Sequence, residues 1–239
     1  MGLEEGGSPR APLAPRAPPR DSPSNPHRVT RRRTLTALAA YAALAALALT
    51  WAWATVWPAG GSLWRHPRPW LALAPERALV VSLGGGVALA VLVVLASRVL
   101  VRRARWARRL HLGFRALLGE LSDGQVVAFA LASGLVEELV FRGALQPLLG
   151  WVPTALAFGL IHVGPDRRFL PWTISAVVVG LLLGGLYELT GHLAGCVLAH
   201  VLVNFVNLRH IRSEDLGVAD LPQPRAPSLV GDRARATRR

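Results

Sequence analysis

Three charged side chains interrupt a long apolar segment in the second half of this 239-residue chain. The stretch GLVEELVFRG, residues 134–143, places Glu137, Glu138 and Arg142 among apolar neighbours. An acidic or basic side chain at the centre of a membrane-spanning helix costs about 2.5–3.5 kcal/mol on insertion scales. Glu138 and Arg142 are four residues apart, so on a helix they share a face and can pair. Glu137 is rotated by about 100° along the helix, which leaves it free to face a cavity.

Two further polar groups follow on later apolar segments. FGLIH places Phe158 and His162 four residues apart, and HVLVN does the same for His200 and Asn204. Each pair shares a helix face. The simpler interpretations are a core histidine and an interhelical hydrogen bond, although ionisable groups inside a membrane tend to be functional. Cys196 lies one turn before His200. A nucleophilic Cys–His pair is one interpretation, but a small packing residue is the simpler one, because only His200 is near enough to activate the thiol.

Counting the rise of a helix suggests that these polar groups meet at one depth. Glu137 lies about 16 Å into its segment and His200 about 12 Å into its own, and His162 can reach the same region. A buried glutamate can take a proton from water, and a histidine can share that water or protonate the leaving amine. His200 and Asn204 together can stabilise an oxyanion. This set of side chains can therefore hydrolyse a peptide bond.

A zinc ion held by Glu137, His162 and His200 is the alternative way to activate the water. Using Glu137 as a ligand would leave only Glu138 as a base, and we expect Glu138 to be committed to Arg142. We also expect His200 to be paired with Asn204 rather than with a carboxylate. These two expectations favour a mechanism without a metal.

The composition indicates an integral membrane protein. The chain is 52% hydrophobic, and all of its 27 basic residues are arginine, giving a formal charge of +13. The arginines flank apolar segments, so membrane orientation explains them more simply than nucleic-acid binding, and we expect no nucleic-acid partner. The single cysteine excludes an intrachain disulfide and a cysteine-based zinc cluster. Frequent Arg, Ala, Leu and Gly suggest a GC-biased gene and a bacterial host.

We predict an all-α polytopic membrane protein with about six transmembrane helices and the three motifs on the last four. A basic amphipathic stretch, 102–115, is expected at the membrane surface. The fourth apolar segment measures only about 18 Å. The six segments are 35–57, 78–101, 126–149, 152–163, 171–189 and 192–208.

The domain prediction is a disordered basic tail over 1–33, a membrane domain over 34–208 and a second basic tail over 209–239. The two tails hold seven arginines each, and alternate connections between the apolar segments are arginine-rich. This alternation predicts that both termini are cytoplasmic. The alternative for 35–57 is a signal peptide, cleaved after the sequence AWA at 52–54.

The motifs EExxxR, FxxxH and HxxxN, in this order on successive apolar segments, resemble those of the CPBP family of intramembrane proteases. The family name covers CAAX proteases and bacteriocin-processing enzymes, and the family includes the type II CAAX prenyl endopeptidases. The resemblance covers about residues 120–208. It implies a polytopic helical fold and a glutamic-type endopeptidase. We expect no cofactor, with a zinc ion as the alternative given above.

Carried over to this chain, the resemblance assigns roles to seven positions. Glu137 would be the base that activates water, and His162 would be its partner on that water. His200 and Asn204 would lie at the oxyanion. The remaining three residues would support them: Glu138, Arg142 and Phe158.

The expected function is hydrolysis of a peptide bond in or near the C-terminal region of membrane-anchored or lipidated protein substrates, in a bacterial inner membrane. Bacterial family members similar to myxosortases process C-terminal anchoring signals, and the composition is compatible with that activity. One alternative is a non-catalytic scaffold or self-immunity protein on the same fold. The other is a transporter that uses Glu137 and the histidines as a proton relay, although the chain shows no repeated half.

Overall fold

The computed structural model describes residues 26–214 and residue 216, and this part of the chain is helical, without a named strand. The parts of the two predicted tails at 1–25 and 217–239 lie outside the described residues. Residues 26–33 and 209–213 differ from the prediction, because helix α1 already begins at Pro26 and helix α8 continues to Ser213. The elements are α1 (Pro26–Trp51), η1 (Ala52–Val56), α2 (Pro75–Arg103), α3 (Arg105–Leu118), α4 (Asp123–Glu138), η2 (Leu139–Leu145), α5 (Gln146–Leu149), α6 (Trp151–Ile161), η3 (Arg167–Phe169), α7 (Leu170–Thr190) and α8 (Ala194–Ser213).

The all-α polytopic prediction is confirmed, with one difference in the number of full spans. Within the described residues, five helical stretches are long and apolar enough to cross a membrane: Thr34–Val56, Pro75–Arg103, Asp123–Leu149, Arg167–Thr190 and Ala194–Ser213. The fourth apolar segment, 152–163, forms α6, which has only 11 residues, about 16 Å of helix. A helix of that length reaches the middle of a bilayer core but does not cross it.

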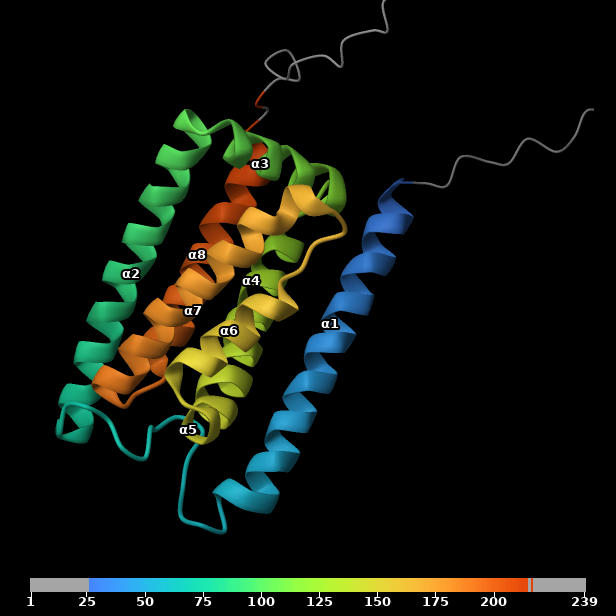
Figure 1. The fold of residues 1–239 in the computed structure, drawn as a ribbon. Coiled ribbons are helices and arrows are strands. Elements are labelled where there is room, and N and C mark those ends of the chain that lie inside the picture. The colour runs from blue at the N-terminus through green and yellow to red at the C-terminus, as the bar shows by residue number, and fades with distance from the viewer. Residues whose placement is uncertain (1–25, 215, 217–239) are drawn as a thin grey trace, which may run out of the picture.

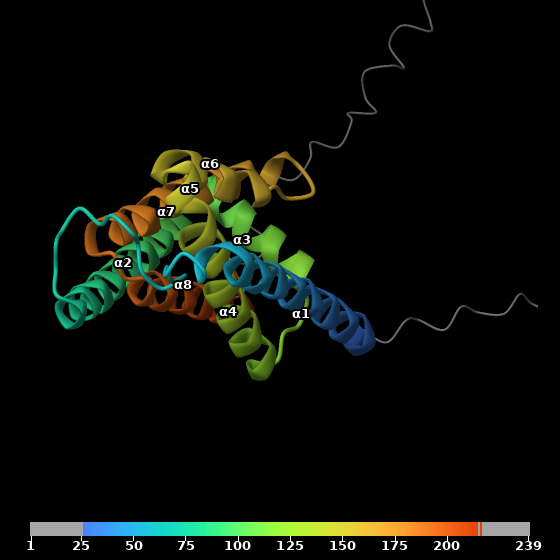
Figure 2. The same cartoon turned by 90° about the horizontal axis from the view of Figure 1, so that it is seen from below.

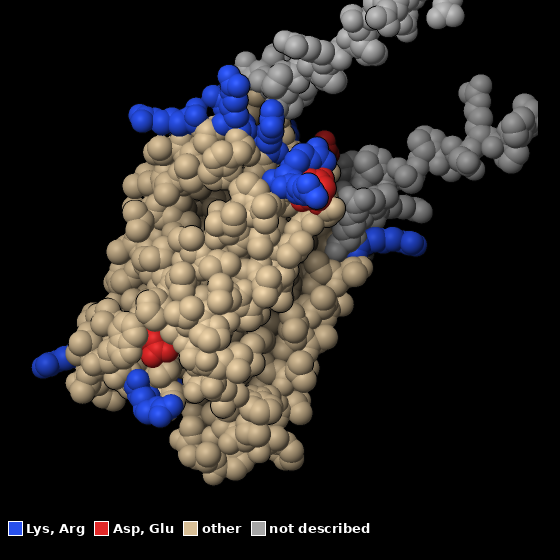
Figure 3. Space-filling view, in the orientation of Figure 1, with Lys and Arg blue, Asp and Glu red and all other residues tan. Residues whose placement is uncertain are grey.

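The helices run antiparallel as a bundle (Figure 1). The start of α1 and the end of α8 lie at the same end of this bundle. α3 lies across that end, next to the start of α1 and the end of α8. On the face that Figure 3 shows, arginines gather at this end, and a broad band of surface without exposed charges separates them from a smaller charged group at the opposite end. This is the pattern expected of a protein that crosses a bilayer. Which end faces the cytoplasm stays a prediction.

The helix with the first motif changes its winding at the motif. α4 begins at a capping box, in which the Ser122 and Gln125 side chains each bond the other's backbone N–H. After Glu138 the helix continues as seven residues of wider π-helix, η2. Pro147 follows in α5, and Gly150 ends this stretch with a positive φ of 88°. The sequence predicted one regular helix over 126–149. π-Helical turns inside an α-helix are frequent at functional sites.

Small residues bring α2 and α8 into close contact. A Cβ atom added at Gly86 would lie 2.2 Å from the carbonyl oxygen of Gly195. The Ser82 hydroxyl joins the same contact, accepting the Gly195 N–H at 3.0 Å and donating to the His192 carbonyl at 2.6 Å. Between helices in lipid, close packing and hydrogen bonds replace the hydrophobic drive that operates in water. This contact fixes α8, which carries the third motif, against the bundle.

We expect Gly86→Ala to lower the melting temperature of the detergent-solubilised protein, because the new methyl group clashes with the backbone of α8. Overpacking of this kind costs about 1–3 kcal/mol. Gly84→Ala is the matched control, since it lies on the same helix and a Cβ there meets no atom within 4 Å. Equal melting temperatures for the two variants would show that α2 and α8 do not pack closely at Gly86.

Candidate active site

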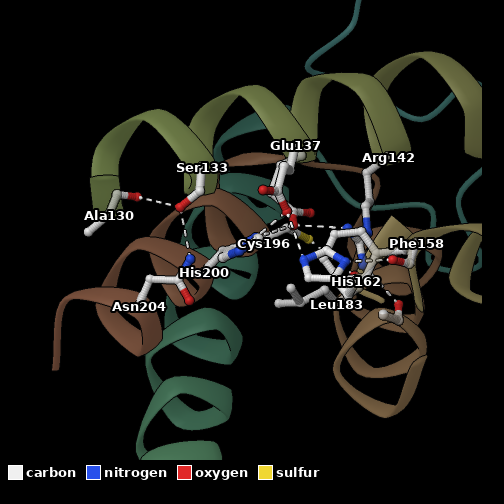
Figure 4. A network of polar contacts seen from close by, with 12 residues as sticks. Ala130, Ser133, Glu137, Arg142, Phe158, His162, Leu183, Cys196, His200 and Asn204 are labelled. Atoms are coloured by element: carbon white, nitrogen blue, oxygen red, sulfur yellow. Dashed lines mark hydrogen bonds and ion pairs between the residues drawn. The ribbon is translucent and has the colours of Figure 1, made fainter. Parts of the chain in front are cut away.

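Glu137 occupies the centre of the polar cluster, near the end of α4 (Figure 4). Its side chain is buried, and its two oxygens have different surroundings. Oε1 accepts a hydrogen bond of 2.7 Å from the Tyr41 hydroxyl on α1. Oε2 lies 3.5 Å from Nε2 of His162 and 3.9 Å from Nε2 of His200. The structure therefore brings together the acid and the two imidazoles that the sequence singled out.

His162 is held at the point where α6 ends. Its Nδ1 lies 2.6 Å from the carbonyl oxygen of Phe158, and because a carbonyl only accepts, Nδ1 must carry the hydrogen. The Thr173 hydroxyl donates to the His162 carbonyl at 2.7 Å. The rings of Phe158 and Trp172 lie 4.5 Å and 5.2 Å from the imidazole, centroid to centroid. These contacts direct Nε2 of His162 toward Glu137.

His200 is oriented from α8 by a carboxylate. Its Nδ1 lies 2.7 Å from Oε1 of Glu138, and the Arg142 guanidinium donates to the same oxygen at 2.9 Å. The predicted Glu138–Arg142 pair is therefore present, but the expectation that this pair uses up Glu138 is wrong. The sequence missed the shared contact because α8 is 62 residues away along the chain.

Arg142 connects the first motif to the helices around it. Its guanidinium donates to the Gly180 carbonyl on α7 at 3.1 Å and lies over the Phe158 ring at 4.4 Å. The side chain is 1% exposed and Glu138 is 0% exposed. Two charged groups that are buried this completely in an apolar bundle are tolerated only if they pair with each other and make further hydrogen bonds.

Asn204 lies one turn beyond His200, and both side chains are directed toward α4 (Figure 4). The Asn204 amide donates to the Ser133 hydroxyl at 2.8 Å, one turn before Glu137. The expected pairing of His200 with Asn204, in place of a carboxylate, is wrong, because Glu138 is the partner of His200 and Ser133 is the partner of Asn204.

Cys196 belongs to the packed core. It is fully buried, and its thiol lies 3.2 Å from the Leu183 carbonyl. It joins an apolar cluster with Tyr187, Leu193 and Ala199. The packing interpretation of the single cysteine is the one that these contacts support.

The donor set does not form a metal centre as it is arranged. Among the described residues, no group of three His, Cys, Asp or Glu side chains could hold a metal ion. Glu138 on His200 is, however, the kind of carboxylate partner that orients metal-bound histidines in other proteins. The sequence argument that His200 lacks such a partner therefore fails.

Two residues at the site were not predicted from the sequence. Tyr41 lies in the first apolar segment, where no motif was found, and Ser133 lies one turn before the first motif. The only signal for Tyr41 was a hydroxyl in the middle of an Ala- and Leu-rich run, in a chain with two tyrosines. Such a signal does not reveal the partner, because Glu137 is 96 residues away along the chain.

We expect Arg142→Ala to reduce both the yield of folded protein and its melting temperature in detergent, because Glu138 loses its cationic partner. Breaking a buried ion pair in this way costs about 3–5 kcal/mol. Arg109→Ala removes an exposed arginine from α3 and serves as the control. An unchanged melting temperature for Arg142→Ala would contradict the structural importance of the pair.

Comparisons with known proteins match the part of the chain that carries the three motifs. The family model described as type II CAAX prenyl endopeptidase Rce1-like matches residues 123–206. The uncharacterized protein YpbD of Bacillus subtilis (strain 168) is 30% identical over 136 residues, covering 54% of this chain and 68% of that protein. No solved structure matches the chain. With the matched segment containing all three motifs of the buried cluster, the chain belongs to the Rce1-like type II CAAX prenyl endopeptidase family, within the CPBP group.

Proposed function

We propose that this protein is an intramembrane endopeptidase of the glutamic type, which cleaves in or near the C-terminal region of membrane-anchored or lipidated proteins. Family membership supports the protease activity in general. The single observation that carries the mechanism is the position of Glu137 Oε2, a buried oxygen without a hydrogen-bond partner in the described structure that faces two imidazole nitrogens.

The contacts of the two histidines determine what their free nitrogens can do. Because Nδ1 carries the hydrogen in His162, Nε2 of a neutral ring presents a lone pair toward Glu137. Two acceptors that face each other at 3.5 Å need a shared proton or a bridging water. A water between Glu137 and His162 can donate to both, and this is the nucleophile that we propose.

The proposed reaction follows from this placement. Glu137 takes a proton while the water oxygen attacks the scissile carbonyl carbon, and the carbonyl oxygen becomes an oxyanion. His200, as an imidazolium held by Glu138, donates from Nε2 to that oxyanion. Asn204 can add its second amide hydrogen, since Ser133 uses only the first. The C–N bond then breaks, and the proton on Glu137 passes to the leaving amine.

We propose a bacterial cell membrane as the location, with the arginine-rich end of the bundle in the cytoplasm. The distribution of arginine in Figure 3 supports this orientation. The partners of such an enzyme are the bilayer and membrane-bound protein substrates, without nucleic acid.

Glu137→Gln should abolish cleavage and leave folding intact, because the amide keeps the shape of the side chain but cannot accept the proton from water. The measurement compares the C-terminal peptides of the membrane proteome in a deletion strain complemented with wild type or variant, so the substrate need not be identified beforehand. Glu76→Gln, at an exposed position of α2, is the matched control.

C-terminal cleavages that persist in the Glu137→Gln strain would rule out Glu137 as the base. If wild type and Glu137→Gln produce the same peptides as the deletion strain, the protein is not a protease under these conditions. The non-catalytic scaffold or self-immunity function would then replace our proposal.

Cleavage by the purified protein should survive treatment with a chelator, and bound zinc should be well below one ion per chain. The reason is that Glu137 cannot both bind a metal and act as the base, while Glu138 already holds Arg142 and His200. Metal content and cleavage are measured on the same sample before and after chelation. Stoichiometric zinc whose removal stops cleavage, and whose return restores it, would favour a metalloprotease.

A further inference from the structure

Tyr41 makes the shortest contact of the Glu137 carboxylate within the described part of the chain. Its hydroxyl lies 2.7 Å from Oε1, whereas the two imidazole nitrogens lie 3.5 Å and 3.9 Å from Oε2. A phenol in contact with a carboxylate acts as the hydrogen-bond donor. Tyr41 thus occupies one oxygen of the carboxylate and leaves the other to the histidines.

This contact limits the rotation of the carboxylate. The last torsion of a glutamate side chain is broad and has no strongly preferred value, so burial alone does not determine which oxygen faces the histidines. A directional hydrogen bond to Oε1 supplies that orientation. Efficient proton transfer requires the base to lie within hydrogen-bond reach of the water, so a rotated carboxylate would be a poor base.

The helix that provides Tyr41 stands at the edge of the bundle (Figures 1 and 2). Besides the Tyr41 contact, its described polar contacts with α4 include a hydrogen bond of 2.8 Å from Gln125 to Thr34. At its other end, the segment that continues α1 buries Ala52 against Leu63 and Ala144. α1 is therefore attached at both ends, with Tyr41 between them at the depth of the site.

An apolar cavity of about 250 Å³ opens between α1 and η2, beginning one turn beyond Tyr41 and Glu137. Its lining includes Leu44, Leu47 and Val140. Apolar surroundings strengthen a hydrogen bond between polar groups, because water does not compete for either partner. The Tyr41–Glu137 bond lies next to such surroundings.

We propose that Tyr41 is a positioning residue for the base of the reaction: its hydroxyl holds Glu137 so that Oε2 meets the water and the histidines. The proposal rests on the proposed function of Glu137. It extends the site to α1, outside the segment 123–206 that matches the family. It also requires α1 to be retained in the active protein, since cleavage as a signal peptide after residue 54 would remove Tyr41.

Tyr41→Phe tests the hydroxyl while keeping the ring. The substrate probe is a synthetic peptide that contains the cleavage site mapped by the proteome comparison, and the enzyme is the full chain in liposomes. We expect kcat to fall by about 10- to 100-fold, the effect of one lost hydrogen bond to a charged group. KM should stay within about twofold, because substrate contacts are untouched. The melting temperature should fall modestly, because a buried oxygen of Glu137 loses its donor.

Thr34→Val is the matched control. It removes a second hydrogen bond between described residues of α1 and α4 without touching Glu137, and kcat should remain that of wild type. Replacement of Tyr41 by p-aminophenylalanine restores a donor at the same place, and kcat should recover toward wild type. This variant also keeps the proposal testable if Tyr41→Phe fails to fold.

Three kinetic results would overturn the proposal. They are a kcat of Tyr41→Phe within twofold of wild type, a Thr34→Val enzyme as slow as Tyr41→Phe, and a folded p-aminophenylalanine enzyme that remains slow. Failure of the proposed function gives a different result, since wild type and Glu137→Gln would then be equally inactive or equally active. The mass of the purified active protein shows whether α1 is retained, and an active enzyme that lacks α1 would also contradict the role of Tyr41.

Discussion

A fully buried carboxylate in an apolar bundle needs more than one polar partner, and Glu138 obtains its partners from two elements. Arg142 reaches it from η2 and His200 reaches it from α8. An uncompensated charge at this place would cost several kcal/mol, so α8 must present His200 to α4 in one rotational setting. In that setting the second nitrogen of His200 is directed toward Glu137. Arg142 and His200, which compensate the charge of Glu138, thereby also arrange the surroundings of Glu137.

Arg142 extends the same constraint to α6 and α7. Its hydrogen bond to Gly180 and its position over the Phe158 ring fix the guanidinium between these helices. Phe158 in turn provides the backbone carbonyl that accepts a hydrogen bond from Nδ1 of His162 and so fixes the tautomer of the ring. Charge compensation, helix packing and imidazole orientation are therefore consequences of one connected set of contacts. This explains how a short helix such as α6, which does not cross the membrane, can still place His162 firmly in the site.

The remaining helices hold this arrangement by close contact. In lipid, apolar side chains gain little from leaving their surroundings, so small residues and interhelical hydrogen bonds have a larger share of the stabilisation. The α2–α8 contact at Gly86 and Gly195 is of this kind, and so is the contact of Gly134 on α4 with Val201 on α8. Both involve α8, the helix whose rotation decides where His200 points.

Much of this protein follows from local sequence patterns. Long apolar segments flanked by arginine predict a polytopic helical protein, because backbone groups in lipid must be satisfied within helices. The four-residue spacing of Glu138 and Arg142 predicts their ion pair, since both lie on one helix. The three motifs together predict the family. Each of these inferences depends on residues that are near one another in the chain, and the structure and the comparisons confirm them.

The partners of the site residues were decided by the tertiary structure. Sequence reasoning paired His200 with Asn204, its neighbour on the helix, whereas their contacts are with Glu138 and Ser133 on another helix. It found no role for the first apolar segment, which supplies Tyr41 to Glu137. The spacing of residues along one helix shows which side chains share a face. It does not show which face of a distant helix will be opposite, because that depends on the packing and rotation of every helix in the bundle at once.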